Sequence, residues 1–551
     1  MFLEPFPEFI LFPLPHPFAK TGNGFIFSSF ANGLVKFVKN IILVRIKFCE
    51  ILINFKLIDL DIKGGSIMEL QNYHTGNFFD EMLDEKSQIR EPYQKLWEKL
   101  KNLPIQEIQQ HQYVAERSLL NKGVTFNVYS ENAGIEKIFP FDIIPRIIPG
   151  NEWEELDRGL KQRIAALNMF IDDVYNGQKA IKDKIIPRSI VLSSKDYLKE
   201  VQGFSPPHKI WCHISGIDLI RHSDGKYYIL EDNLRVPSGV SYVLENRDIT
   251  KRTFPELMED LSIRTVLNYP SKLLEMLLFI SGRQDAQAAL LTPGIYNSAY
   301  FEHTFLAKQM GIELVEGNDL FVENDIVYMK TTRGPKRVHV IYRRIDDRFL
   351  DPTAFNPDSL LGVPGIFKAY KKNKIALANA PGTGVADDKV ICSYVPKLIK
   401  YYLGEDAIIP NVPTFLCSIK KERDHVLANL SNMVVKAANQ SGGYGMLVGP
   451  SASKKEISDF KDNIIANPRN YIAQPVMALS TVPTLVDDHL EGRHVDLRPY
   501  IICGESTYVI SGGLTRVALK KGSLVVNSSQ GGGSKDTWVV DSGSQEGGLY
   551  A

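Results

Sequence analysis

The segment YYILEDNLRVPSG, residues 227–239, predicts a β-strand that breaks at Pro237-Ser238-Gly239. Successive side chains of a strand point to opposite faces, so Glu231 and Asn233 share one face and Asp232 points away from it. A carboxylate and an amide oxygen on one face suit Mg²⁺ that is carried by a nucleotide. The segment therefore predicts part of a metal site.

A tight turn just before this strand supplies a third oxygen ligand. Asp224-Gly225 separates two apolar runs, which is a strong signal for a β-hairpin with a two-residue loop. With this loop, Asp218 lies directly opposite Glu231. Two carboxylates so placed repel each other, and a cation between them removes the repulsion. Asp218, Glu231 and Asn233 are therefore the predicted Mg²⁺ ligands. A solvated hairpin with polar outer residues is the alternative.

A lysine and a glycine-rich loop follow much later, in MVVKAANQSGGYGMLVG, residues 433–449. Glycines let backbone N–H groups approach phosphate oxygens closely, and a lysine adds a positive charge. The predicted phosphate-binding residues are Lys436, Gly442, Gly443 and Gly445. The order of residues matches neither the P-loop nor the dinucleotide-binding fingerprint, and a plain glycine hairpin is the alternative. Gln474, in YIAQPV, is predicted to contact the adenine.

Three arginines on predicted strands are candidates for catalysis: Arg343, Arg498 and Arg516. A guanidinium binds carboxylates bidentately and stabilises a phosphoryl group during its transfer. For any single arginine, an ordinary ion pair is the alternative.

Composition narrows the class of protein. The chain carries 64 basic and 64 acidic side chains, and this balance argues against a nucleic-acid partner, which needs clustered positive charge. The five cysteines are scattered without a CxxC pair, so we expect free thiols in the cytoplasm.

The first 67 residues have a different composition, rich in Phe, Ile, Leu and Pro. Their longest apolar run is interrupted by Arg45, Lys47 and Glu50, so it falls short of a span of about 20 apolar residues. We therefore expect no stable membrane insertion. The change in composition predicts that residues 1–67 are a non-native or disordered extension and that the protein proper starts at Met68.

Periodicity predicts the elements of the remaining chain. Charge interleaving at helical spacing predicts an amphipathic helix pair over residues 77–103, and a second helix ends at Asn176-Gly177. Helices closed by glycine alternate with short strands over residues 265–400, which favours an α/β region of Rossmann-like size. From residue 401 the pattern is rich in strands and glycine.

Seven separated segments, in order, resemble the circularly permuted ATP-grasp family, which is related to glutathionylspermidine synthetase. They are GIDLIRHSDGKYYILEDNLRVPSGVSYVLENR, LTPGIYNSAYFEH, VIYRRIDDRFLDP, GTGVADDK, VVKAANQSGGYGML, IAQPVMALSTVPTL and GRHVDLRPYI. The resemblance implies an α/β (α+β) fold in which the last strands of the ATP-grasp domain come early in the chain.

The resemblance also implies a division of the chain into parts. After the extension at 1–67 these parts are a helical region at 68–205, the permuted metal-site strands at 206–264, an inserted Rossmann-like pre-ATP-grasp domain at 265–400, the nucleotide-binding region at 401–541 and a flexible tail at 542–551.

The activity implied by the resemblance is ATP-dependent ligation. ATP phosphorylates a carboxylate of a small molecule or peptide, and an amine displaces the phosphate to give an amide. Asp218, Glu231 and Asn233 match the magnesium ligands, and Arg498 is the candidate for stabilising transition-state charge. Gly216 departs from the related synthetases, which carry an arginine there, and this weakens the inference of a glutathione substrate. A catalytically silent ATP-binding scaffold and a phosphotransferase acting on a hydroxyl are the alternatives.

Overall fold

The computed structural model describes residues 70, 73–130, 133–138, 140–439, 445–524, 526 and 532–542. The chain divides into two compact units, Met1–Ser66 and Ile67–Ala551, and the description below concerns the second. The predicted extension at 1–67 and almost all of the predicted tail at 542–551 lie outside the described residues.

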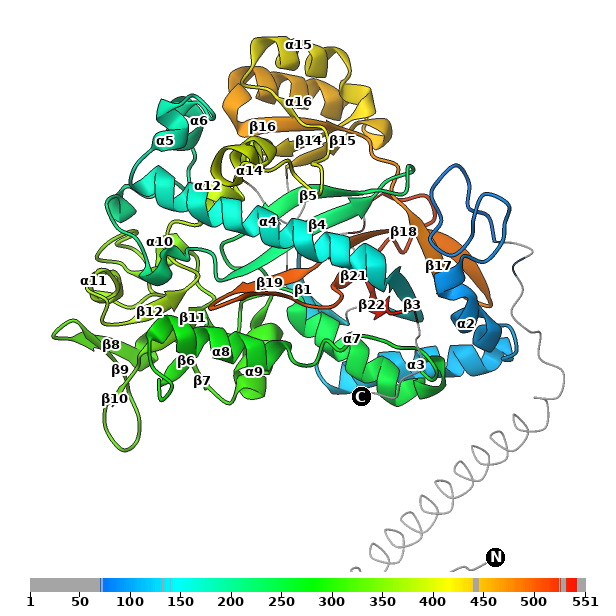
Figure 1. The fold of residues 1–551 in the computed structure, drawn as a ribbon, viewed down its shortest axis with the longest axis horizontal. Coiled ribbons are helices and arrows are strands. Elements are labelled where there is room, and N and C mark those ends of the chain that lie inside the picture. The colour runs from blue at the N-terminus through cyan, green and yellow to red at the C-terminus, as the bar shows by residue number, and fades with distance from the viewer. Residues whose placement is uncertain are drawn as a thin grey trace, which may run out of the picture. The chain divides into compact units, whose positions relative to one another are not determined.

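A nine-stranded sheet organises the second unit, with the order β20-β19-β4-β18-β21-β22-β3, β17 beside β18 and β5 beside β4. Its strands are β3 (Phe141–Pro149), β4 (Ile214–Arg221), β5 (Tyr227–Asn233), β17 (Thr481–Val486), β18 (His489–Arg498), β19 (Tyr500–Cys503), β20 (Thr507–Val509), β21 (Leu514–Val517) and β22 (Gly533–Val540). The early strand β4 lies between the late strands β18 and β19 (Figure 1). This arrangement confirms the predicted permutation, because the early hairpin completes a sheet built from C-terminal strands.

Helices cover both faces of this sheet. On one face α4 (Gly150–Tyr175) contributes Ile164 and Leu167 to a core shared with Ile217 and Leu219 of β4. It ends at Tyr175, as the sequence predicts. On the other face α3 (Ile105–Asn121) and α7 (Val240–Thr253) share a second core with residues of β19 and β21.

The prediction of a helix pair over residues 77–103 is wrong in its first half. Only α2 (Glu91–Leu100) is helical, with Pro92 in its first turn. Before it, the buried carboxylate of Asp80 accepts hydrogen bonds from the backbone N–H groups of Met82 and Leu83. Such local side-chain bonds compete with helix formation, so this stretch forms turns despite its helical periodicity.

A four-stranded parallel sheet occupies the predicted range 265–400, with the order β12-β11-β6-β7. Its strands are β6 (Ala288–Leu291), β7 (Glu313–Val315), β11 (Val340–Arg343) and β12 (Ala376–Ala378). Helices α8 (Tyr269–Ser281) and α9 (Tyr300–Met310) each end at a glycine of positive φ, Gly282 and Gly311. The left-handed backbone conformation that ends a helix favours glycine, because glycine has no Cβ to clash. This is the physical reason why the helices end where the sequence predicts.

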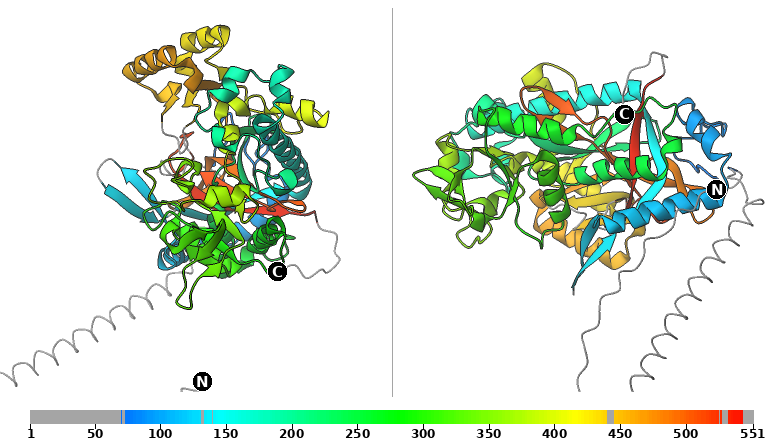
Figure 2. Two further views of the ribbon diagram at one scale, coloured as in Figure 1. Left: turned by 90° about the vertical axis from the view of Figure 1, so that its left-hand side faces the viewer. Right: turned by 90° about the horizontal axis from the view of Figure 1, so that it is seen from below.

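A second four-stranded sheet, with the order β13-β16-β14-β15, lies to one side of the main sheet (Figures 1 and 2). Its elements are β13 (Phe415–Leu416), β14 (Met433–Ala437), β15 (Met446–Val448), β16 (Tyr471–Pro475), α15 (Lys420–Ala428) and α16 (Lys454–Ala466). Val435 and Ala473 pack with Val426 of α15 and Ile464 of α16. The two helices therefore cover one face of this sheet, and the opposite face carries Lys436.

The remaining elements are shorter. They are β1 (Thr125–Ser130), β2 (Ala133–Ile138), α5 (Lys179–Lys182), α6 (Arg188–Leu192), β8 (Leu320–Glu323), β9 (Ile326–Met329), β10 (Lys336–Arg337), α10 (Asp347–Leu350), α11 (Ile366–Lys371), α12 (Gly384–Asp387), α13 (Lys389–Cys392) and α14 (Val395–Leu403). Four cysteines, Cys212, Cys392, Cys417 and Cys503, are buried free thiols. Within the described ranges, no helix has the length and apolar character needed to cross a membrane.

Candidate functional site

The hairpin of β4 and β5 turns through a longer loop than the sequence predicts. The N–H of His222 donates to the carbonyl of Lys226 at 2.9 Å, so the loop has three residues, Ser223 to Gly225. Gly225 has a φ of +76°, as expected for a three-residue hairpin loop that closes with a left-handed glycine. This loop by itself shifts the strand register by one residue from the predicted pairing.

A β-bulge then restores the predicted pairing where it matters. Leu219 pairs with Ile229, but Asp218 pairs with Glu231, so Leu230 is the extra residue on β5. A bulge of this kind re-aims the side chains that follow it. The prediction that Asp218 lies opposite Glu231 is therefore confirmed, through two deviations that cancel.

Two arginines bind the buried carboxylate of Asp218. Arg498 donates to it from Nε and also from Nη2, the latter at 2.8 Å, and Arg516 donates from Nη2 at 2.7 Å. Burial raises the pKa of Asp218, but the two guanidinium groups lower it more, so its pKa lies below the ordinary value. Asp218 is therefore an anion at neutral pH. Arg516 also binds Asp496, at 2.8 Å from its Nε.

Two lysines approach the other carboxylate, Glu231. The Nζ of Lys389 lies 3.2 Å from its Oε2. Burial raises the pKa of Glu231, but Lys389 and Lys436 lower it to a net value below the ordinary one. For Lys436 itself, burial lowers the pKa, and the nearby carboxylates of Glu231 and Asp218 only partly oppose this effect. Glu231 and Lys436 thus lie in one electrostatic cluster although a whole parallel sheet separates them in the sequence.

Lys389 is the site residue that the sequence interpretation missed. It is the first residue of α13 and lies in GTGVADDK, one of the segments that carry the family resemblance. A lysine that follows two acids looks like part of a solvated charge run. The structure instead buries most of its side chain beside Glu231, with 13% exposed.

Asn233 has an unsatisfied group in this cluster. Its side-chain amide nitrogen is buried and has no hydrogen-bond partner. It pairs with Gly216 across the ladder, so no side chain stands directly opposite. The nitrogen and oxygen of an amide exchange places by a half-turn, so Asn233 is able to present an oxygen to a cation. Buried polar atoms without partners are rare in proteins, so Asn233 has unused capacity to bind a ligand.

The three predicted ligands are of the type that binds a cation arriving with a nucleotide. Across the part of the chain that the structure describes, no group of three or more His, Cys, Asp or Glu side chains could hold a metal ion by itself. Two carboxylates and one amide oxygen leave coordination positions open. Mg²⁺ is commonly held in this way, by one or two carboxylates together with substrate phosphates.

The sheet of β13, β16, β14 and β15 presents Lys436 and Gln474 on the same face. Lys436 pairs with Ile472 and Val434 pairs with Gln474, so the two polar residues lie on the face opposite the α15–α16 core. The side chain of Gln474 is buried and donates to the hydroxyl of Thr414 at 3.1 Å. Of the predicted loop glycines, Gly445 has a φ of +64°, whereas Gly442 and Gly443 lie outside the described residues.

Gly216 leaves room for Arg498. An ideal Cβ at position 216 would lie 3.2 Å from Cδ and 3.4 Å from Cγ of Arg498, which is tighter than ordinary packing. The arginine stem therefore lies directly over the glycine and reaches Asp218. Gly216, where the related synthetases carry an arginine, thus packs against the side chain of Arg498.

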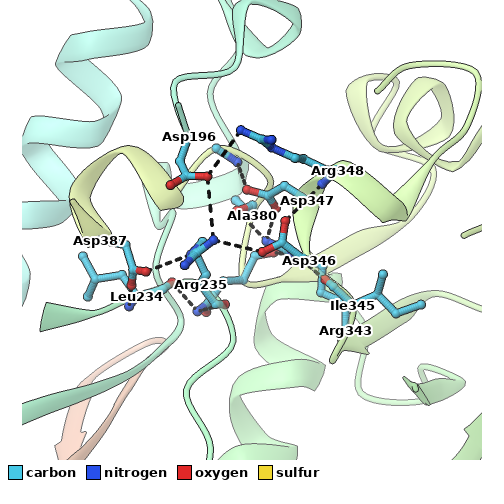
Figure 3. A network of polar contacts seen from close by, with 12 residues as sticks. Asp196, Leu234, Arg235, Arg343, Ile345, Asp346, Asp347, Arg348, Ala380 and Asp387 are labelled. Atoms are coloured by element: carbon cyan, nitrogen blue, oxygen red, sulfur yellow. Dashed lines mark hydrogen bonds and ion pairs between the residues drawn. The ribbon is translucent and has the colours of Figure 1, made fainter. Parts of the chain in front are cut away.

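Arg343 is not among the groups that meet at Asp218. It is fully buried and donates to the carbonyl oxygens of Asn379 at 2.6 Å and Ile345 at 2.8 Å, and it pairs with Asp347 at 2.5 Å (Figure 3). Ile345 and Asn379 lie just after β11 and β12, and Asp347 is the first residue of α10. Arg343 is the last residue of β11, and its side chain ties the two loops together.

Comparison with known proteins agrees with this arrangement. The chain matches the family described as circularly permuted ATP-grasp type 2 over residues 145–518. An uncharacterized protein of Synechocystis sp. is 56% identical over 481 residues, which cover 87% of this chain and 100% of that protein. A protein of Frankia alni, named as a candidate glutamate–cysteine ligase, is 39% identical over 477 residues, which cover 85% of this chain and 54% of that protein.

A solved structure shares the fold. A glutathione synthetase-like effector from Globodera pallida, in its apo form, aligns with a TM-score of 0.51 at 12% identity and covers 80% of this chain and 98% of its own. At this identity the likeness concerns the fold alone. From the matched range, the close relative and the permuted sheet together, the chain belongs to the circularly permuted ATP-grasp family of type 2.

Proposed function

We propose that this protein is an ATP-dependent ligase that joins a carboxylate to an amine, forming an amide and releasing ADP and phosphate. The observation that carries the proposal is the ion pair of Glu231 with Lys389 at 3.2 Å. The backbone N–H of Lys389 donates to the carbonyl of Ala438 at 3.0 Å, directly after β14, the strand that carries Lys436. A metal-binding carboxylate and lysines for the phosphates have to lie together if they act on one ATP molecule. The name of the Frankia relative supports a ligase, but the match covers 54% of that protein, so its substrates are not carried over.

The residues divide the work in the following way. Lys436 and Lys389 offer positive charge to the phosphates, and Gln474 lies on the face where the adenine would bind. Asp218, Glu231 and Asn233 would hold Mg²⁺, which neutralises phosphate charge when it is bound. The substrate carboxylate attacks the γ-phosphorus, the bond to the β-phosphate oxygen breaks, and ADP leaves. The amine then attacks the carbonyl carbon of the acylphosphate, phosphate leaves with the electron pair of the broken C–O bond, and the nitrogen loses a proton to the solvent or to the departing phosphate.

Arg498 has a distinct place in this scheme. Oδ1 of Asp218 accepts one N–H of arginine and Oδ2 accepts two, so one lone pair of Oδ1 stays open to a cation. A cation bound there would compete with Arg498 for the carboxylate and favour release of its guanidinium. The released guanidinium then lies beside the incoming phosphates, where it is able to stabilise developing negative charge. Arg516 keeps its second partner, Asp496, throughout.

The test is a screen for release of ADP and phosphate from Mg²⁺-ATP with amino acids, small peptides and polyamines. Hydroxylamine added in place of the amine traps an acylphosphate as a hydroxamate, which a hydroxyl phosphotransferase does not form. Glu231→Gln should abolish turnover, and Glu313→Gln, which changes an exposed carboxylate of β7, serves as the matched control. ATP binding without turnover in any mixture would favour a silent scaffold, and full activity of Glu231→Gln would overturn the assigned site.

A further inference from the structure

One carboxylate holds the chain segment that directly follows the metal-site strand. The Oδ1 of Asp387 accepts the backbone N–H of Leu234 at 2.7 Å, and its Oδ2 accepts Nε of Arg235 at 2.8 Å (Figure 3). Leu234 and Arg235 come immediately after Asn233, the last residue of β5. Asp387 therefore ties α12 to the end of the strand that carries Glu231.

The same carboxylate lies two residues before Lys389. Between them, Asp388 accepts the backbone N–H of Val390 at 2.9 Å and binds Nη2 of Arg469 at 2.7 Å. Helices α12 and α13 have four residues each, and helices so short are not stable without tertiary contacts. The position of Lys389 thus depends on the anchors at either side of it, and Asp387 is the anchor that faces β5.

Arg235 links the Asp387 contact to the loops of the parallel sheet. Its Nη1 donates to Oδ2 of Asp346 at 3.0 Å and lies 3.7 Å from Asp196. Gly384, the first residue of α12, packs directly against it, since an ideal Cβ there would lie 2.8 Å from Cδ of Arg235. A larger residue at position 384 would separate α12 from the arginine.

We propose that Asp387 and Arg235 are positioning residues that hold Lys389 beside Glu231 at the phosphate site. This inference rests on the proposed function, because it assigns Lys389 to ATP. Both residues act on Lys389 through the chain segments that they join. Asp387 acts through its charge as well, because after Glu231 it is the next carboxylate that raises the pKa of Lys389. A lysine has a flexible stem and makes no rigid fork of hydrogen bonds, so its charge is only useful where its backbone is fixed.

The experiment is a double-mutant cycle on the affinity for Mg²⁺-ATP, measured by isothermal titration calorimetry on the full chain. Asp387→Asn and Arg235→Gln should each weaken binding by about 10-fold, as is usual for groups that orient a ligand-binding residue. Lys389→Met should weaken binding as well, and Asp387→Asn should add nothing further in the Lys389→Met background. Arg235→Lys should lose less affinity for ATP than Arg235→Gln, because it keeps the positive charge.

Asp325→Asn is the matched control, because Asp325 forms an ion pair with Lys368 at 3.1 Å in another part of the chain. Its affinity for ATP should equal that of the unchanged protein. Independent, additive losses from Asp387→Asn and Lys389→Met would overturn the positioning role. If Asp387→Asn does not fold, the cycle of Arg235→Gln with Lys389→Met decides the question by the same criterion. Failure of the unchanged protein to bind ATP would instead overturn the proposed function.

Discussion

Replacing Asp232 by alanine should destabilise the protein by about 3–5 kcal/mol, because it breaks a buried ion pair. Asp232 follows Glu231 on β5 but points to the opposite face. Its side chain is 0% exposed, and it binds Nε and Nη2 of Arg163 at 2.6 and 2.7 Å. The alanine variant leaves the guanidinium of Arg163, a residue of α4, buried without a counter-charge, with Asn411 and Cys392 as its remaining partners.

The assay is thermal unfolding followed by circular dichroism, with a second substitution as the internal check. Arg163→Met in the Asp232→Ala background removes the stranded charge, so the double variant should regain most of the lost stability. Asp232→Asn keeps an oxygen acceptor and should lose less than the alanine variant. A stabilising role for this ion pair is excluded if Asp232→Ala melts at the temperature of the unchanged protein, or if the double variant melts no higher than Asp232→Ala.

Three further outcomes are expected. Lys436→Met should weaken ATP binding without lowering the melting temperature, because it removes a buried charge; unchanged affinity in calorimetry would contradict its role at the phosphates. Gly216→Ala should slow ATP turnover and change the melting temperature little, because the added methyl would lie 3.2 Å from Cδ of Arg498. Unchanged turnover would contradict this. Burial raises the pKa of Asp196 from 3.8 to about 6, so the folded state holds this proton more tightly than the unfolded chain and loses stability as the pH rises from about 4 to about 6. Asp196→Asn should therefore increase the free energy of unfolding at pH 7.5 by at most about 3 kcal/mol and raise the melting temperature accordingly. Near pH 3.5 it should leave the melting temperature unchanged. An equal gain at both pH values would contradict the assignment.

Local sequence patterns predict where several helices end. The end of α4 and the glycine-closed ends of α8 and α9 lie where the pattern places them, because these signals depend on neighbouring residues only. The stretch before α2 departs from its pattern for a reason that is also local. There the Asp80 carboxylate takes up backbone N–H groups that a helix would need.

The hairpin shows how a correct pairing can rest on an incorrect loop. Asp224-Gly225 predicts a two-residue loop, and the structure has three residues there. A β-bulge at Leu230 compensates for the difference. No pattern in the sequence marks this bulge, since it depends on how β5 fits between β4 and the segments packed on it.

The alternation along β5 is readable from the residues alone, and it places Glu231 toward the site and Asp232 away from it. The sequence also determined the family, through motifs spread over the whole chain. Only the tertiary structure decided the partners: Lys389 beside Glu231, Arg498 over Gly216, and Arg343 among the loops of the parallel sheet. The alternation of side chains is a property of the local backbone. Which charges become neighbours depends on how distant segments pack, and a single sequence does not state that.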